Sequence, residues 1–445
     1  MNAEKSFLPE STLVKQRSGI RRAVIASTVG TVIEWFDYAL YGSASALVIN
    51  KLFFPQLSNL AGILAAFATF AIGFFVRPIG GMIIAHIGDK FGRKPALLLT
   101  IILMGIATVG MGLLPTYAQV GILAPILLVL TRVLQGFGAG AEYAGAVTLV
   151  AEYSPPGEQA KLTAILQSAS LGGILLSTIV FLAVAQLPED VLLAWGWRIP
   201  FLLSIFLFVI AVYIRKHLEE TPEYNLAMAK AAKNKREKQI PIKDLLKNSP
   251  KEVIFGFLSI TGHNANAYLL GSFVLSYLTN TVKMPKSDGL VVVMISTLVG
   301  ALMTPLAGKI ADRIGCAPVY AFGAVFTGIY VYPLLMILQQ GNLLFSILAM
   351  SLAYGVGFAT LAGAQGAFLS NLFPTRYRYS GIAITRELNA MLIAGPTPFI
   401  ATALVAAAGG SPYYVAGYMS LCCLATFVAI YALVRVQKRA VSTEY

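Results

Sequence analysis

Seven ionisable residues stand inside long apolar stretches of this 445-residue chain. They are Glu34, Asp37, Arg77, Arg132, Glu142, Arg386 and Glu387. A charge within an apolar helix costs several kcal/mol unless it has a partner. Because the seven residues comprise four acids and three bases, we predict that they form ion pairs. An acid beside an arginine can also take up a proton and release that arginine to another anion, which couples proton binding to anion binding.

The first two acids are three residues apart, so Glu34 and Asp37 share one face of a helix, with Tyr38 and Tyr41 close by. At about 1.5 Å per residue they lie roughly 15–20 Å from one end of their apolar run, near its middle.

Arg132 stands at a comparable depth in a later apolar run, and Gln135 lies on nearly the same side of that helix. The sequence thus predicts that acids from one helix meet an arginine from another.

The composition is that of a protein embedded in a membrane. Hydrophobic residues make up 57% of the chain and charged residues only 12%, a balance that soluble globular proteins do not have. The net charge of +13 does not point to nucleic acid, because the basic residues gather in alternate loops. Three cysteines form neither a disulfide framework nor a metal-ligand spacing.

Apolar runs long enough to cross a bilayer predict an all-α fold with twelve spans. We expect the spans near residues 23–48, 60–86, 96–115, 119–150, 160–185, 198–214, 252–279, 289–311, 318–338, 343–372, 380–407 and 413–434. An even number of spans places both termini on one side of the membrane.

The distribution of basic residues predicts which side that is. With the termini inside, the cytoplasmic segments hold 26 of the 33 lysines and arginines. Cytoplasmic loops are enriched in these residues, so we expect a multi-pass membrane protein with both termini in the cytoplasm. No cleavable signal peptide is apparent before the first span.

Segment 215–251 is the only long polar interruption, and it separates six spans from six. We expect a cytoplasmic N-terminus at 1–22, a first six-helix bundle at 23–214, a cytoplasmic linker at 215–251, a second bundle at 252–434 and a cytoplasmic tail at 435–445. The octet GDKFGRKP at 88–95 recurs as ADRIGCAP at 311–318, which supports two related halves. The second copy lacks two basic residues of the first, so we expect the stronger cytoplasmic lock at the first copy.

The octet at 88–95 resembles the signature loop of the major facilitator superfamily. Other segments, including IEWFDYALYG (33–42), LTRVLQGFGAGAEYAGA (130–146) and WGWRIPF (195–201), resemble its metabolite:proton symporter family, in the branch of shikimate and related organic-acid carriers. The resemblance implies two pseudo-symmetric six-helix bundles, alternating access and proton-driven symport, with the first and fourth helices lining a central cavity.

On this basis an Asp37–Arg132 or a Glu34–Arg132 pair is expected to face the substrate. The proton-coupling candidates are Asp37, Glu34 and His263. The substrate-binding candidates are Arg132, Gln135, Tyr38, Tyr41, Tyr268, Gln365 and Arg386. The gating candidates are Asp89, Arg93, Arg77, Glu142 and Glu387, and Arg77 is expected to pair with Glu142 or with the signature loop.

Each of these assignments has a structural alternative. A buried ion pair can simply hold two helices together. His263, which stands beside Asn264 and Asn266, is either a second proton site or a hydrogen-bonded packing residue. Arg386 contacts either a second substrate carboxylate or another side chain, and Glu387, about 100° away on the same helix, needs a different partner.

Other classes of protein fit less well. Three scattered histidines supply neither a catalytic set nor a metal site, so we expect no enzyme, no metal and no cofactor beyond the proton gradient. The sequence shows neither a filter motif nor a repeated ring of like charges, which are the features that would indicate a channel. We expect a monomeric symporter that imports a small organic acid, with a shikimate-like monocarboxylate first. Di- or tricarboxylates, and zwitterions such as proline or betaine, are the alternatives.

Overall fold

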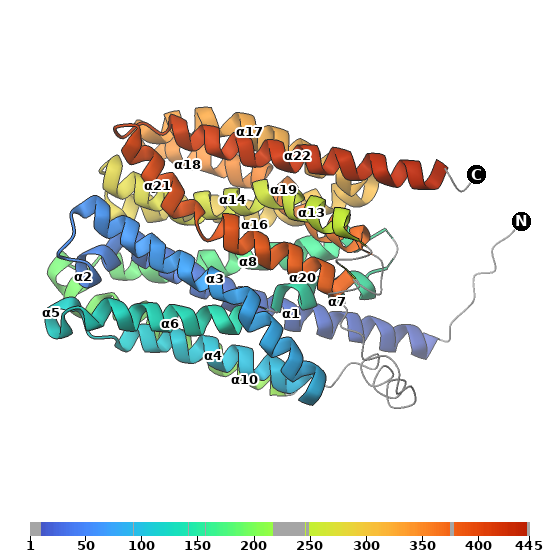
Figure 1. Cartoon of the computed structure of the whole chain (residues 1–445), viewed down its shortest axis with the longest axis horizontal. Coiled ribbons are helices and arrows are strands. Elements are labelled where there is room, and N and C mark those ends of the chain that lie inside the picture. The colour runs from blue at the N-terminus through green and yellow to red at the C-terminus, as the bar shows by residue number, and fades with distance from the viewer. Residues whose placement is uncertain are drawn as a thin grey trace, which may run out of the picture.

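The computed structural model describes residues 10–91, 93–140, 142–155, 157–216, 245, 249–373 and 378–442. Within these ranges the helices group into twelve rods (Figure 1). Helices satisfy their own backbone hydrogen bonds, which apolar surroundings require. The rods agree with the spans predicted from the apolar runs.

The first six rods lie mainly in the lower half of Figure 1. They are α1 (Glu10–Ala44) with η1 (Ser45–Ile49) and α2 (Asn50–Phe53), α3 (Asn59–Phe91), α4 (Arg93–Leu113), α6 (Leu123–Ala139) with α7 (Glu142–Tyr153), α8 (Gln159–Ala185), and α10 (Arg198–Lys216). The short helices α5 (Tyr117–Val120), α9 (Glu189–Val191) and η2 (Leu192–Gly196) connect them.

The last six rods lie mainly in the upper half of the same view. They are α13 (Pro250–Ser259) with α14 (Thr261–Tyr268), η3 (Leu269–Phe273), α15 (Val274–Ser276) and η4 (Tyr277–Thr281), then α16 (Lys286–Ile314), α17 (Cys316–Gln339), α18 (Leu343–Leu352) with η5 (Ala353–Phe358) and α19 (Ala359–Leu372), α20 (Arg378–Asn389) with η6 (Ala390–Ala394) and α21 (Thr397–Ala407), and α22 (Tyr413–Ser442). The described termini, which are the start of α1 and the end of α22, lie at the same end of the molecule (Figure 1), as an even number of spans requires.

Eight helices in the described ranges are long and apolar enough by themselves to cross a membrane. A ninth candidate is the pair Glu189–Gly196 and Arg198–Ile214, which is bent by 43°. The rod from α13 to η4 consists of short pieces and carries His263, Asn264 and Asn266. Departures from a continuous apolar helix therefore coincide with residues that the sequence marks as candidates for function.

Helices α3 and α6 pack with their backbones in contact. A Cβ atom on Gly136 would lie 2.0 Å from the Gly73 carbonyl oxygen, and one on Gly140 would lie 2.1 Å from the Arg77 carbonyl oxygen. Any larger side chain at these two positions would force the helices apart. Between the halves, α8 packs along α16, and α3 packs against η6 and α21.

Candidate functional site

Four buried charges come from three rods that meet inside the first half of the molecule. Helix α1 carries Glu34 and Asp37 on one face, α3 carries Arg77, and α6 carries Arg132. All four side chains are almost completely buried, with residue exposures of 2% or less. Since burying an unpaired charge is costly, the partners of each one define what the site can do.

Glu34 forms an ion pair with Arg77. The Arg77 Nη2 atom lies 3.1 Å from Glu34 Oε1, and Arg77 Nε donates to the Tyr38 hydroxyl at 3.0 Å. The guanidinium also lies 4.2 Å above the Tyr38 ring centroid and 4.6 Å from that of Phe74. These ring contacts are favourable for a cation that has lost its water.

This pairing differs from the sequence-based expectation. We predicted Glu142 or the signature loop as the partner of Arg77, and Arg132 as a possible partner of Glu34. Counting residues from the ends of apolar runs gives depth but not the direction in which α3 crosses α1. The side chains of Asp89, Arg93 and Glu142 lie outside the part of the chain that the structure describes, so their predicted gating roles stay predictions.

Asp37 and Arg132 are linked through Gln135 rather than in direct contact. Gln135 Nε2 donates to Asp37 Oδ2 at 3.4 Å, and Arg132 Nη1 donates to Gln135 Oε1. Thr108 of α4, which the sequence reasoning missed, donates to the same Asp37 oxygen at 2.7 Å and accepts from Gln135 at 2.9 Å. Asp37 Oδ1 has no hydrogen-bond partner among the described residues. The carboxylate therefore keeps one oxygen available for a proton.

Aromatic rings surround the Arg132 guanidinium. It lies 4.1 Å from the Tyr41 ring centroid and 5.3 Å from that of Phe70, and its Nη2 donates to the Phe70 carbonyl at 3.2 Å. The Tyr41 hydroxyl is 2.5 Å from Thr69 Oγ1. The described residues offer no partner for Arg132 Nε. Arg132 is thus held by weak contacts and one amide, which a stronger anionic ligand can replace.

A neutral polar group joins the two halves near these charges. Gln167 of α8, which the sequence reasoning missed, lies 3.4 Å from His263 Nε2 and donates to Gln365 Oε1 at 3.4 Å. The His263 ring lies 5.0 Å from that of Phe358, and its Nδ1 has no partner within the described ranges. The available signal for Gln167 was that it is the one glutamine in the predicted span 160–185.

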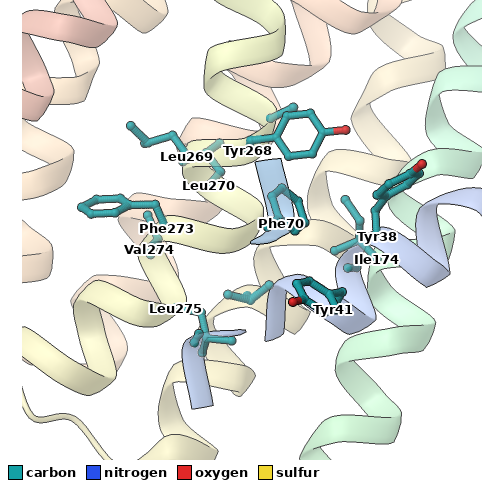
Figure 2. Packing of buried hydrophobic residues seen from close by; sticks show 14 of the residues in the cluster. Tyr38, Tyr41, Phe70, Ile174, Tyr268, Leu269, Leu270, Phe273, Val274 and Leu275 are labelled. Atoms are coloured by element: carbon teal, nitrogen blue, oxygen red, sulfur yellow. The ribbon is translucent and has the colours of Figure 1, made fainter. Parts of the chain in front are cut away.

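Tyr268 lies at the centre of an aromatic cluster. Its ring centroid is 5.6 Å from that of Trp35, 5.9 Å from that of Phe70 and 5.2 Å from that of Phe74. Figure 2 shows Tyr268 of α14 facing Phe70 of α3, with Tyr38 and its neighbours on α1 nearby. The cluster joins the second half to α1 and α3, which carry Glu34 and Arg77.

The two charges of the eleventh rod have separate surroundings, as the angle between them predicts. The Arg386 guanidinium lies 3.2 Å from the ring centroid of Tyr143 on α7. Glu387 is 6% exposed, and its Oε2 has no partner in the described part of the molecule. Arg386 thus meets an aromatic ring of the other half.

The halves are also tied together at both ends. At the end that holds the termini, Asp312 of the second octet accepts from the backbone N–H groups of Ala160 and Lys161 at 2.8 and 2.9 Å. The carboxylate therefore caps the first turn of α8, where the helix dipole favours a negative charge.

At the opposite end, Glu189 Oε1 lies 2.5 Å from Lys51 Nζ and 3.3 Å from Lys286 Nζ. Its hydrogen bonds to these two lysines lower the pKa of the exposed Glu189 carboxyl below its usual 4.5. Asn280 also donates to the Ala46 carbonyl at 2.9 Å. Lys51 and Glu189 belong to the first half and Lys286 to the second.

The side chains gathered here are of the types that bind anions and exchange protons. Among the described residues, no group of three or more His, Cys, Asp or Glu side chains could hold a metal ion. The ion pair and the Asp37–Gln135–Arg132 link lie within the first half, and their partners include several that a ligand can replace. The geometry suits a binding site that changes its contacts when a carboxylate is protonated.

Comparison with known proteins places the chain among transporters. The family model described as "Major Facilitator Superfamily" matches residues 28–391. The chain is 35% identical over 428 residues to the shikimate transporter of Escherichia coli K12, which covers 93% of this chain and 96% of that protein. It is 34% identical over 393 residues to the "Glycine betaine/proline/ectoine/pipecolic acid transporter OusA" of Dickeya dadantii, covering 87% of this chain and 78% of that protein.

Solved structures agree in fold. The crystal structure of a D-xylose-proton symporter has a TM-score of 0.72 at 21% identity and covers 93% of this chain and 97% of its own. The partially occluded, inward-open xylose transporter XylE of E. coli also has a TM-score of 0.72, at 19% identity, and covers 94% of this chain and 98% of its own. The predicted family, fold and non-enzymatic class are confirmed: the chain is a multi-pass bacterial membrane transporter and belongs to the major facilitator superfamily.

Proposed function

We propose that the protein is a proton-coupled symporter that imports a small organic acid by alternating access, with a shikimate-like monocarboxylate as its substrate. The observation that carries this proposal is the buried Asp37–Gln135–Arg132 link, in which the acid and the arginine each keep one unpaired polar atom. The similarity to a shikimate transporter over almost the whole chain supports the same substrate class.

The proposed coupling follows from these contacts. A proton on Asp37 removes the negative charge that attracts Gln135 and Arg132. Gln135 then holds Arg132 less firmly, and the guanidinium accepts the carboxylate of the substrate as a bidentate partner. The loaded site carries fewer unpaired charges than either empty state, so the halves can rearrange around it.

Hydroxyl groups of such a substrate would meet neutral partners from the second half. Gln167, His263 and Gln365 present amide and imidazole groups, and Tyr268 offers an aromatic face. Polar groups that fix orientation around an apolar or aromatic wall are typical of small-molecule sites. In this arrangement Arg132 binds the charge of the substrate and the second half recognises its shape.

A zwitterionic osmolyte such as proline or betaine is the second candidate. The stacked Trp35 and Tyr268 rings, 5.6 Å apart, suit a quaternary ammonium group, because the faces of aromatic rings attract cations. Several relatives are named as proline or betaine transporters. A di- or tricarboxylate would need Arg386, whose guanidinium lies over Tyr143 in this structure.

We further propose that the end that holds the termini faces the cytoplasm, since the predicted inner segments hold 26 of the 33 basic residues. The protein would then act in the bacterial inner membrane as a monomer, without a cofactor. Its bundles would span 23–214 and 252–434, joined by the linker 215–251. The Asp312 contact on α8 would lie at the inner face and the Glu189 contacts at the outer face.

The decisive experiment is uptake of labelled substrates by the purified protein in lipid vesicles, with and without an inward proton gradient. We expect shikimate to accumulate against its gradient and a protonophore to abolish that accumulation. Accumulation of glycine betaine but not of shikimate would move the protein to the osmolyte class. Shikimate uptake that is equal with and without the proton gradient would refute proton coupling.

A further inference from the structure

A pocket lies between the two halves at the end opposite to the termini. It has a volume of about 320 Å³, within the usual range for small-molecule sites. Its lining comes from the start of α3, from η3, α15 and η4, and from α21 and the turn after it. The lining residues include Leu60, Ile63, Tyr277, Asn280, Thr402, Val405 and Ala406. Because both halves form its walls, the pocket changes shape whenever the halves move.

The lining has hydrogen-bonding groups but no formal charge. Tyr277 is 1% exposed, and its hydroxyl has no partner among the described residues. Asn280 donates to Ser276 Oγ at 3.3 Å, and Thr402 Oγ1 donates to the Pro398 carbonyl at 2.8 Å, which leaves the Thr402 oxygen able to accept. A buried hydroxyl without a partner is costly, and a ligand with hydroxyl groups would remove that cost.

A series of aromatic side chains connects the pocket to the buried charges. Tyr277 stacks on Phe273 with ring centroids 5.7 Å apart. Tyr268, nine residues before Tyr277 and roughly 13 Å deeper along the same rod, belongs to the cluster with Phe70 and Trp35. Phe70 in turn contacts Arg132 through its carbonyl and its ring. A solute in the pocket is therefore separated from Arg132 by the aromatic cluster.

We propose that this pocket is an outer subsite that holds the uncharged, hydroxyl-bearing ring of the substrate before it passes the aromatic cluster. The inference rests on the proposed import of a hydroxylated organic acid, and adds a second binding position to it. Tyr277 recognises a ring hydroxyl there, while Leu60, Ile63 and Val405 contact the apolar face of the ring. A ligand without hydroxyl groups gains little from these residues.

The test measures protection of a cysteine from a membrane-impermeant maleimide applied from outside. Ala406→Cys places the thiol on the pocket wall, and Gln56→Cys, on an exposed turn outside the pocket, is the matched control. Cells that express the unmodified chain give the background from Cys316, Cys422 and Cys423. We expect shikimate to slow labelling of Ala406→Cys but not of Gln56→Cys. Glycine betaine should not slow either reaction.

Two further variants separate the pocket from the central site. Tyr277→Phe removes one hydroxyl with no change in shape, and should raise the shikimate concentration for half-protection about three- to tenfold. Protection should persist when Arg132→Ala is added to Ala406→Cys. If Arg132→Ala abolishes protection, the pocket merely reports binding at the central site and the subsite does not exist.

An uncharged ring compound tests hydroxyl recognition by the pocket independently of the proposed transport of an acid. Cyclohexane-1,2,3-triol carries ring hydroxyls but no carboxylate, and it should protect Ala406→Cys at higher concentrations than shikimate. Equal protection by betaine, or no protection by either ring compound, would overturn hydroxyl recognition. Absence of shikimate uptake by the native protein would instead refute the proposed function, whatever the labelling result.

Discussion

The two halves of the transporter supply different chemistry to the centre of the molecule. The first half contributes Glu34, Asp37, Arg77 and Arg132, whose ion pair and charge-linked hydrogen bonds lie within that half. The second half contributes neutral groups around His263, such as Asn264, which donates to Asn389 at 2.8 Å. The charges linked to Asp37 are thus grouped in one half, while the groups of the second half around His263 are neutral and its own buried charges, Arg386 and Glu387, lie on α20. If the proposed function holds, this difference predicts that proton coupling and substrate selection can be altered by separate mutations.

The largest predicted effect is at Asp37. Asp37→Asn keeps the hydrogen-bonding shape but cannot exchange a proton, so uphill, proton-driven uptake should be lost while some exchange of internal for external substrate remains. Counterflow and gradient-driven uptake in vesicles measure the two activities. Concentrative uptake at the native level would remove Asp37 from coupling, and Glu34→Gln is the matched test of the neighbouring acid.

The next largest effect is expected on substrate binding when Arg132 of the first half is replaced. Arg132→Ala should raise the half-saturation concentration for the substrate at least about tenfold, because a charge-assisted bidentate contact contributes roughly 1.5–3 kcal/mol. Arg132→Lys keeps the charge without the planar fork and should recover only part of the loss. Unchanged binding of the substrate to Arg132→Ala, measured by thermal shift, would exclude Arg132 from the site.

A smaller effect on substrate affinity is expected at His263, among the neutral groups of the second half. His263→Gln keeps a polar group opposite Gln167, and should change the half-saturation concentration only about two- to fivefold, as the loss of one neutral hydrogen bond does. The dependence of uptake on the proton gradient should stay intact. Loss of gradient dependence in His263→Gln, with substrate binding retained, would make His263 a proton carrier and end the separation between the halves.

The smallest effect is expected at the exposed Glu189 contacts, since ion pairs in water contribute little. Glu189 has a lowered pKa in the folded protein, so its contacts contribute above the ordinary glutamate pKa of 4.5 and are lost as the pH falls through the lower, folded-state value. Glu189→Gln should therefore change uptake by less than about threefold, and equally at about pH 5.5 and about pH 7.5. Asp190→Asn, on the same short helix, is the matched control. A pH-dependent effect between these values would contradict the assignment.

The sequence was sufficient for the family, the twelve helical rods and the burial of the charges, because apolar length and the cost of isolated charges are local properties. It was not sufficient for the partners of those charges. Arg77 meets Glu34, and Asp37 reaches Arg132 only through Gln135, because helix crossing sets which faces meet. Thr108 and Gln167 were missed for a related reason: a single polar residue in an apolar run indicates burial but not its neighbours.

The backbone contact between α3 and α6 has a consequence for how movement in this protein can be measured. With Gly136 against the Gly73 carbonyl and Gly140 against the Arg77 carbonyl, the two backbones are in direct contact over more than one helical turn. We therefore expect α3 and α6 to move as one unit, so that the backbones at Arg77 and Arg132 keep a constant separation during transport. Probes on the exposed residues Ile79 and Leu130 would report a constant separation, and would serve as an internal length standard against which every other distance change in the molecule can be calibrated.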